Sequence, residues 1–151
     1  MSVALPMQLL RAREALMRQF RPYMRELGVT DQQGRILRAL AEVGWIDMYE
    51  LSVRCCIHPA SLSRIVPRLA NKGLLHRRQD ARDGRRILVR LAPKGKALQK
   101  RFAVRAEEIY GDVAKRIGIS NFDPLHTYLQ AIIDALGGAE ATVPQDDVSN
   151  P

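Results

Sequence analysis

Two short helical patterns joined by a tight turn, and followed directly by two strand patterns, constrain this chain more than any other feature. The first short helix begins after Asp47, which forms a capping pair with Glu50. The second begins at Pro59, a residue that suits the first turn of a helix. Its apolar face repeats at helical spacing and consists of Leu62, Ile65, Val66 and Leu69. Because only residues 56–58 separate the two helices, the pattern predicts a helix-turn-helix.

The segment after the second short helix predicts a β-hairpin with a basic tip. Residues 75–79 and 87–91 bracket the polar sequence DARDGR, and the second run alternates as a half-buried strand does. Five arginines lie within ten residues around this tip: Arg77, Arg78, Arg82, Arg85 and Arg86. Since like charges at this density repel one another, they favour the binding of an anion.

Longer helical patterns flank this unit on both sides. One covers residues 6–27 and contains Pro22, which should kink it. A second begins at Thr30, where Gln33 completes a capping box, and is expected to end at Gly44. Two more are expected over residues 93–117 and 123–136. The predicted fold class is therefore mainly α with a small β-wing, an α+β winged helix-turn-helix.

The basic charge of the chain is concentrated in its middle third. The net charge is +8, and residues 54–105 hold fifteen Lys or Arg against two Asp, whereas residues 121–151 hold five acids and no base. A polyanion would dock on such a segment. Because no apolar run is long enough to cross a bilayer and no secretion signal is present, we expect a cytoplasmic protein without a membrane partner.

The sequence has none of the patterns that assemble a reaction centre. Its three histidines fall on separate predicted elements, and it contains no phosphate-binding glycine loop and no spacing of metal ligands. We therefore expect a protein that is not an enzyme and that holds neither a metal nor a cofactor.

The outward face of the helix from Pro59 carries small residues first and basic residues further along. Ala60 and Ser61 can approach a base edge or a thymine methyl group, and Arg64 can donate two hydrogen bonds to guanine. In the hairpin, Asp83 can brace the loop so that an arginine is free to enter a minor groove. The alternative is an ordinary solvated surface. The candidate DNA-binding residues are Pro59, Ala60, Ser61, Ser63, Arg64, Arg68, Lys72, Arg82, Asp83, Arg85 and Arg86.

The order of these elements resembles the MarR family of bacterial regulators. The stretch SRIVPRLANKGLLHRRQDARDGRRILVRLAPKG contains the family's serine-rich recognition helix, its Gly-Leu turn into the first wing strand and its Asp-x-Arg wing. The stretches LLRAREALMRQFRP, VTDQQGRILRALAE and LSVRCCIHPASL look closer still to the subgroup that represses homoprotocatechuate degradation operons. Three positions depart from the pattern: Pro67 inside the recognition helix, Gly34 in place of a tryptophan and His58 in place of an apolar residue.

The resemblance implies a triangular homodimer that binds double-stranded DNA. Its first and last helices would pair, so residues 1–30 and 93–136 are expected to form a helical dimerisation region. Residues 31–92 would form the winged helix-turn-helix that binds half of a pseudopalindromic operator, and residues 137–151 a flexible tail. The resemblance also implies repression that is relieved by a small aromatic acid.

Arg13 is the first candidate for an effector contact, because it falls within the apolar stripe of the first helix. A buried guanidinium needs a partner, which can be a ligand carboxylate or, alternatively, an acid in a structural salt bridge. Trp45, Tyr49 and His58 can supply aromatic walls and a polar contact, although such residues are more often core.

Two further hypotheses concern function. Cys55 and Cys56 could form the oxidant switch of a redox-sensing repressor, although buried packing residues are the simpler interpretation. A nonspecific architectural DNA binder would also fit the charge, because phosphate contacts give affinity without sequence preference.

Overall fold

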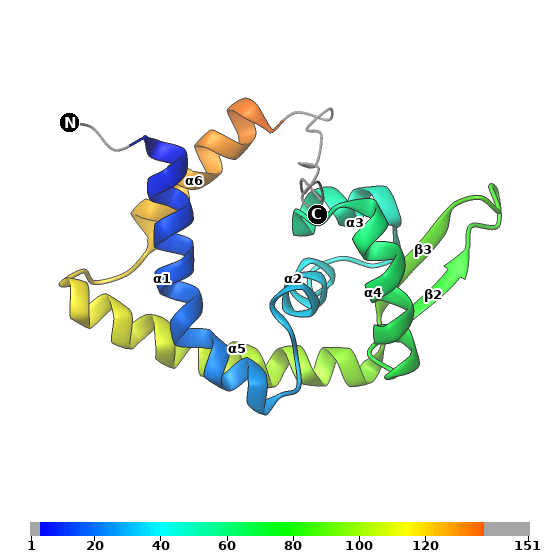
Figure 1. The fold of residues 1–151 in the computed structure, drawn as a ribbon, viewed down its shortest axis with the longest axis horizontal. Helices are drawn as coiled ribbons and strands as arrows, with labels where there is room; N and C mark the ends of the chain where they lie inside the picture. The colour runs from blue at the N-terminus through cyan, green and yellow to red at the C-terminus, as the bar shows by residue number, and fades with distance from the viewer. Residues whose placement is uncertain (1–3, 138–151) are drawn as a thin grey trace, which may run out of the picture.

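The computed structural model of this chain describes residues 4–137, and this part contains six helices and one three-stranded antiparallel sheet (Figure 1). The predicted class, mainly α with a small β-wing, is confirmed. Residues 138–151, nearly all of the tail expected to be flexible, lie outside the described residues. The elements are α1 (Leu5–Glu26), α2 (Asp31–Leu40), β1 (Ile46–Asp47), α3 (Met48–Cys55), α4 (Pro59–Asn71), β2 (Leu75–Gln79), β3 (Ile87–Leu91), α5 (Pro93–Ile117) and α6 (Asp123–Leu136).

Local capping sets where α2 and α3 begin. The Thr30 hydroxyl accepts a hydrogen bond from the Gln33 amide at 3.1 Å, and the Gln33 side chain accepts one from the Thr30 amide at 3.2 Å. At α3 the Asp47 carboxylate accepts from the Glu50 amide at 2.8 Å, but the Glu50 side chain pairs with Arg54 instead of returning to the cap. The second pair is therefore half of a capping box. The α2 helix ends at Leu40, before the expected end at Gly44.

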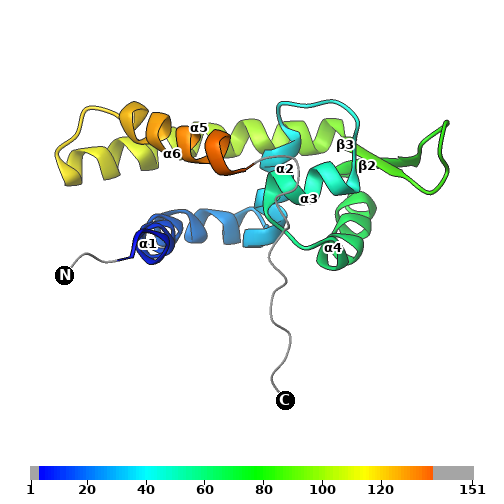
Figure 2. The ribbon, with the colours of Figure 1, turned by 90° about the horizontal axis from the view of Figure 1, so that it is seen from above.

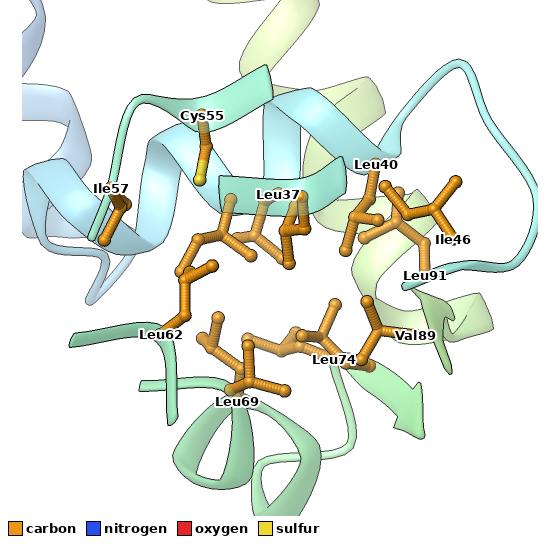
Figure 3. Packing of buried hydrophobic residues seen from close by; sticks show 14 residues of the cluster. Leu37, Leu40, Ile46, Cys55, Ile57, Leu62, Leu69, Leu74, Val89 and Leu91 are labelled. Atoms are coloured by element: carbon orange, nitrogen blue, oxygen red, sulfur yellow. The ribbon is translucent and has the colours of Figure 1, made fainter. Parts of the chain in front are cut away.

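The main core lies between the helix-turn-helix and the hairpin. Apolar side chains of α2, α3 and α4 pack against those of β2 and β3, and Figure 3 shows them converging on one interior. Leu37, Leu51, Leu62 and Val89 are almost completely buried there. Because α4 places Leu62, Val66 and Leu69 into this core, its opposite face is held toward solvent.

The sheet has the strand order β1-β3-β2. The hairpin strands have the predicted bounds and pair with Leu75 opposite Leu91 and Gln79 opposite Ile87. β1 pairs with the other edge of β3, so that Ile46 lies opposite Val89 and is buried. β1 was not predicted, because two residues are too few to show the alternation of a strand.

The remaining helices extend the molecule away from this core. α5 runs from the base of the hairpin to the far end, where the chain turns back into α6 (Figures 1 and 2). α1 is bent and contains Pro22 near its end, in keeping with the expected kink (Figure 1). It packs on α5 through a second cluster of Phe20, Met24 and Ile109. Within residues 4–137, no helix has both the length and the apolar character of a membrane span.

Candidate DNA-binding surface and effector pocket

The exposed face of α4 carries the predicted DNA-binding residues. Pro59, Ala60, Ser63, Arg64 and Arg68 are exposed, Ser61 is half-buried, and Lys72 directly after the helix is also exposed. No side chain of residues 4–137 forms an ion pair with the guanidinium of Arg64 or Arg68. The helix continues through Pro67. This surface therefore presents small residues at a helix N-terminus and free positive charge one and two turns later.

The loop at the hairpin tip is braced by its own aspartates. The Asp83 carboxylate accepts hydrogen bonds from the Arg85 amide at 3.1 Å and from Arg85 Nε at 3.2 Å. Asp80 accepts one from the Arg82 amide at 2.9 Å. The side chain of Arg85 nevertheless remains 93% exposed. The loop thus holds its backbone in shape while the arginine at its tip stays available.

Arg86, also a predicted DNA contact, is held within the protein. It forms ion pairs with Asp47 at 2.6 Å and with Asp80 at 3.4 Å. The Glu50 amide, which donates to Asp47, and Arg86 together hold the pKa of the Asp47 carboxyl below its usual value. This ion pair therefore persists into acid and is lost only as pH falls through that lowered pKa.

The hairpin and α4 lie side by side at one end of the molecule. Both views show the strands emerging next to α4, with the tip projecting beyond the helix (Figures 1 and 2). The β2 strand directly follows the turn at Gly73, whose positive φ of 75° suits glycine. The two predicted DNA-contacting elements are thus brought together by the fold.

A cavity of about 690 Å³ lies where α1, α2, α5 and the end of α3 meet. Its walls are mostly apolar and include the rings of Phe20, Phe102 and Tyr110. Four arginines and one aspartate also line it: Arg13, Arg35, Arg38, Arg54 and Asp31. An apolar cavity with an excess of guanidinium groups suits a small aromatic anion.

Arg13 lines this cavity, as expected for an effector contact, and is also paired within its own chain. Its Nη2 lies 3.1 Å from Asp31 Oδ1, and its Nη1 lies 3.4 Å from Glu14. Arg21 contacts the same two acids, at 3.8 and 3.0 Å. Because two arginines share Asp31, a ligand carboxylate could take its place at Arg13 without leaving Asp31 unpaired. Arg13 is therefore both a residue of the cavity wall and a member of a salt bridge within its own chain.

Trp45, Tyr49 and His58, the other predicted effector residues, are not among the residues that line the cavity. The His58 ring caps α4, with Nδ1 accepting a hydrogen bond from the Ala60 amide at 3.1 Å. Tyr49 is 59% exposed. The Trp45 ring lies under two wing arginines. Their proposed contact with an effector remains a prediction.

Three arginines of the cavity wall, Arg35, Arg38 and Arg54, were not predicted as site residues. Each lies on a helix face that resembles ordinary solvated surface in sequence. Arg38 and Arg54 pair with the acids four residues away, Glu42 and Glu50, both at 2.8 Å. Only the packing of α2 against α1, α3 and α5 turns these faces into a cavity wall.

Arg35 connects the cavity to the turn that precedes α4. Its Nη1 donates hydrogen bonds to the carbonyls of Cys55 at 3.2 Å and Cys56 at 3.0 Å, and its buried Nε has no partner within residues 4–137. Cys56 has a positive φ of 52°, unusual for a residue with a side chain. The turn is thus a constrained segment held by a residue of the cavity wall.

The two cysteines differ in environment. Both are free thiols, Cys55 buried and Cys56 exposed. Burial raises the pKa of the Cys55 thiol to about 11, so it stays protonated and weakly reactive at neutral pH. Cys55 belongs to the main core. These observations favour packing over redox chemistry for Cys55.

A helix-turn-helix with an arginine-tipped hairpin beside its second helix defines a winged helix-turn-helix DNA-binding protein. Comparisons with known proteins agree. Residues 27–86 match the model of the MarR family. The homoprotocatechuate degradative operon repressor of Escherichia coli is 33% identical over 144 residues, which cover 95% of this chain and 97% of the relative. The chain belongs to the MarR family.

Two further relatives extend this comparison. The transcriptional regulator FarR of Neisseria gonorrhoeae is 39% identical over 110 residues, covering 73% of this chain and 75% of that protein. The crystal structure of NadR in complex with 4-hydroxyphenylacetate superposes with a TM-score of 0.78 at 33% identity, covering 92% of this chain and 96% of NadR. FarR is an HTH-type transcriptional regulator, and NadR binds 4-hydroxyphenylacetate.

Proposed function

We propose that this protein is a dimeric repressor that binds a pseudopalindromic operator and leaves it when a small aromatic carboxylate enters the cavity. One observation carries the proposal: the arginine-lined cavity shares Arg35 with the turn that leads into α4. The ligand site and the DNA-binding helix are therefore joined by a single side chain. The aromatic catabolic operon named for the Escherichia coli relative supports the class of effector.

On the DNA side, α4 enters the major groove and the wing the adjacent minor groove. The small residues at the start of α4 allow close approach, and Arg64 forks onto a guanine. Arg68 and Lys72 lie nearer the helix end and contact phosphates. Arg82 and Arg85 at the hairpin tip suit a narrow minor groove. Arg86, which is paired with Asp47, supports the wing in addition to adding positive charge.

A second copy of the chain covers the apolar surface of α6. No residue of this helix is buried, although Leu125, Tyr128, Ile132, Ile133 and Leu136 are large and apolar. The start of α1 exposes Leu5, Met7, Leu9 and Leu10 in the same way. Exposed apolar surface of this extent marks an interface. Residues 1–30 and 93–136 therefore form the dimerisation region, and residues 31–92 the DNA-binding region.

On the ligand side, the cavity matches a ring with an acid group. Its aromatic walls accommodate the ring, and its arginines offer paired donors to a carboxylate. The 4-hydroxyphenylacetate held by NadR is such a molecule. A carboxylate that draws Arg35 toward the cavity would weaken its hold on the carbonyls of Cys55 and Cys56. The turn before α4 then changes, and the two α4 helices of the dimer lose the spacing that the operator requires.

Replacing Arg13 by alanine tests the ligand site. The probe is 4-hydroxyphenylacetate, added to the protein on a duplex of its own promoter. The wild type is expected to release the duplex, whereas Arg13→Ala should bind it normally and need about tenfold or more ligand for release, since a charged hydrogen bond is lost. Arg18→Ala, which removes the same charge from an exposed site on α1 outside the cavity, is the matched control.

Two results would count against this assignment. If Arg13→Ala keeps normal release but melts earlier, Arg13 is a structural partner of Asp31. If neither this ligand nor other aromatic acids release the wild type, the cavity is not the regulatory site.

A further inference from the structure

The residue just before β1 contacts both strands of the wing, by which we mean β2, β3 and the loop of residues 80–86. The guanidinium of Arg78 on β2 lies 4.3 Å from the centre of the Trp45 ring, and that of Arg90 on β3 lies 4.7 Å from it. Trp45 is the only tryptophan of the chain. One aromatic ring thus touches both strands of the wing from outside the hairpin.

The same short segment joins the wing to the start of the helix-turn-helix. Asp47 pairs with Arg86 at the wing tip and at the same time caps α3 through the Glu50 amide. Because β1 is also hydrogen-bonded to β3, residues 45–47 form a strap between the wing and α3, the first helix of the helix-turn-helix. Trp45 lies at one end of this strap and Asp47 at the other.

Physical chemistry explains why the wing needs this support. An isolated two-stranded hairpin is marginally stable in water. Arg78 and Arg90 are exposed and form no ion pair with any of residues 4–137, so the contact that offsets their mutual repulsion is the one with the electron-rich ring of Trp45. Without that ring, the two cations would favour splaying or twisting of the strands.

We propose that Trp45 is a positioning residue for DNA binding, which sets the orientation of the wing relative to α4 by holding Arg78 and Arg90 on its ring. The proposal rests on the proposed function, because the orientation matters only if the wing tip and α4 meet one duplex together. Trp45 itself does not contact DNA but acts through the two arginines that it holds.

A double-mutant cycle on operator binding tests the proposal. Trp45→Leu removes the aromatic face but keeps an apolar side chain, and Trp45→Phe restores a ring. Trp45→Leu is expected to weaken binding to the promoter duplex roughly tenfold, and Trp45→Phe to recover part of that loss. In a background that carries both Arg82→Ala and Arg85→Ala, the wing tip has lost both arginines assigned to the minor groove, and Trp45→Leu should have almost no further effect.

Additive losses from Trp45→Leu and the Arg82→Ala, Arg85→Ala pair would overturn the proposal, since Trp45 would then act independently of the wing tip. An unchanged affinity of Trp45→Leu would overturn it as well. If Trp45→Leu does not fold, the cycle is run with Arg78→Gln and Arg90→Gln together, and the same two outcomes apply. Failure of the proposed function is separate, because the wild type would then show no preference for its promoter.

Discussion

Replacing Arg64 and Arg85 together by alanine is expected to lower the affinity for the operator roughly hundredfold. Each removes a contact worth about 1 to 3 kcal/mol, one in the major groove and one at the wing tip. The losses should add, because the two side chains lie on separate elements and share no partner. Fluorescence anisotropy with a labelled promoter duplex at fixed salt measures the change.

The matched control is the pair Arg18→Ala and Arg25→Ala, which removes the same charge from exposed positions of α1. This control should change the affinity for the operator only slightly, since it lowers the net charge but removes no contact with DNA. Thermal melting of both double variants should stay close to the wild type. Equal losses in the two double variants would mean that charge alone governs binding, and would contradict the assignment of α4 and the wing.

Gly95→Ala is expected to lower the free energy of unfolding by about 3 kcal/mol, the upper part of the usual range for overpacking. Gly95 is buried in the first turn of α5, and a Cβ there would lie 2.2 Å from the carbonyl oxygen of Leu74. That oxygen is backbone and accepts a hydrogen bond from the Ala92 amide at 3.0 Å, so it cannot move freely. The added methyl group therefore forces the start of α5 away from Leu74 at the base of the wing.

Gly111→Ala in the same helix is the matched control for this prediction. A Cβ at Gly111 meets nothing within 4 Å, so alanine should raise stability by about 0.5 to 1 kcal/mol through helix propensity. Urea unfolding of the two variants gives both values. A Gly95→Ala protein as stable as Gly111→Ala would contradict the close packing of α5 on the residue before β2.

Local patterns were sufficient to predict most elements of the fold. The bounds of the hairpin strands and of α5 follow from alternation and from residues that begin or end helices, such as Pro93. These signals depend only on neighbours in the chain. The faces of α4 were predicted for the same reason, because helical spacing separates Leu62 and Leu69 from Arg64 and Arg68.

The cavity and the strap could not be predicted in this way. Arg35 belongs to the cavity wall only because α2 packs against α1 and α5, which are distant in sequence. Trp45 was expected near an effector because an aromatic ring can form the wall of a ligand pocket. An aromatic residue beside a helix start is compatible with many other environments. Its position under Arg78 and Arg90 depends on the register of β1 with β3. A strand of two residues is too short for that register to be predicted from the sequence.

The most direct test of the central claim compares two duplexes at one salt concentration. One carries the protein's own promoter, and the other has the same base composition in scrambled order. A regulator that places α4 and the wing on specific bases should prefer the promoter by roughly a thousandfold or more. Equal affinity for the two duplexes would contradict the account and identify a nonspecific architectural DNA binder.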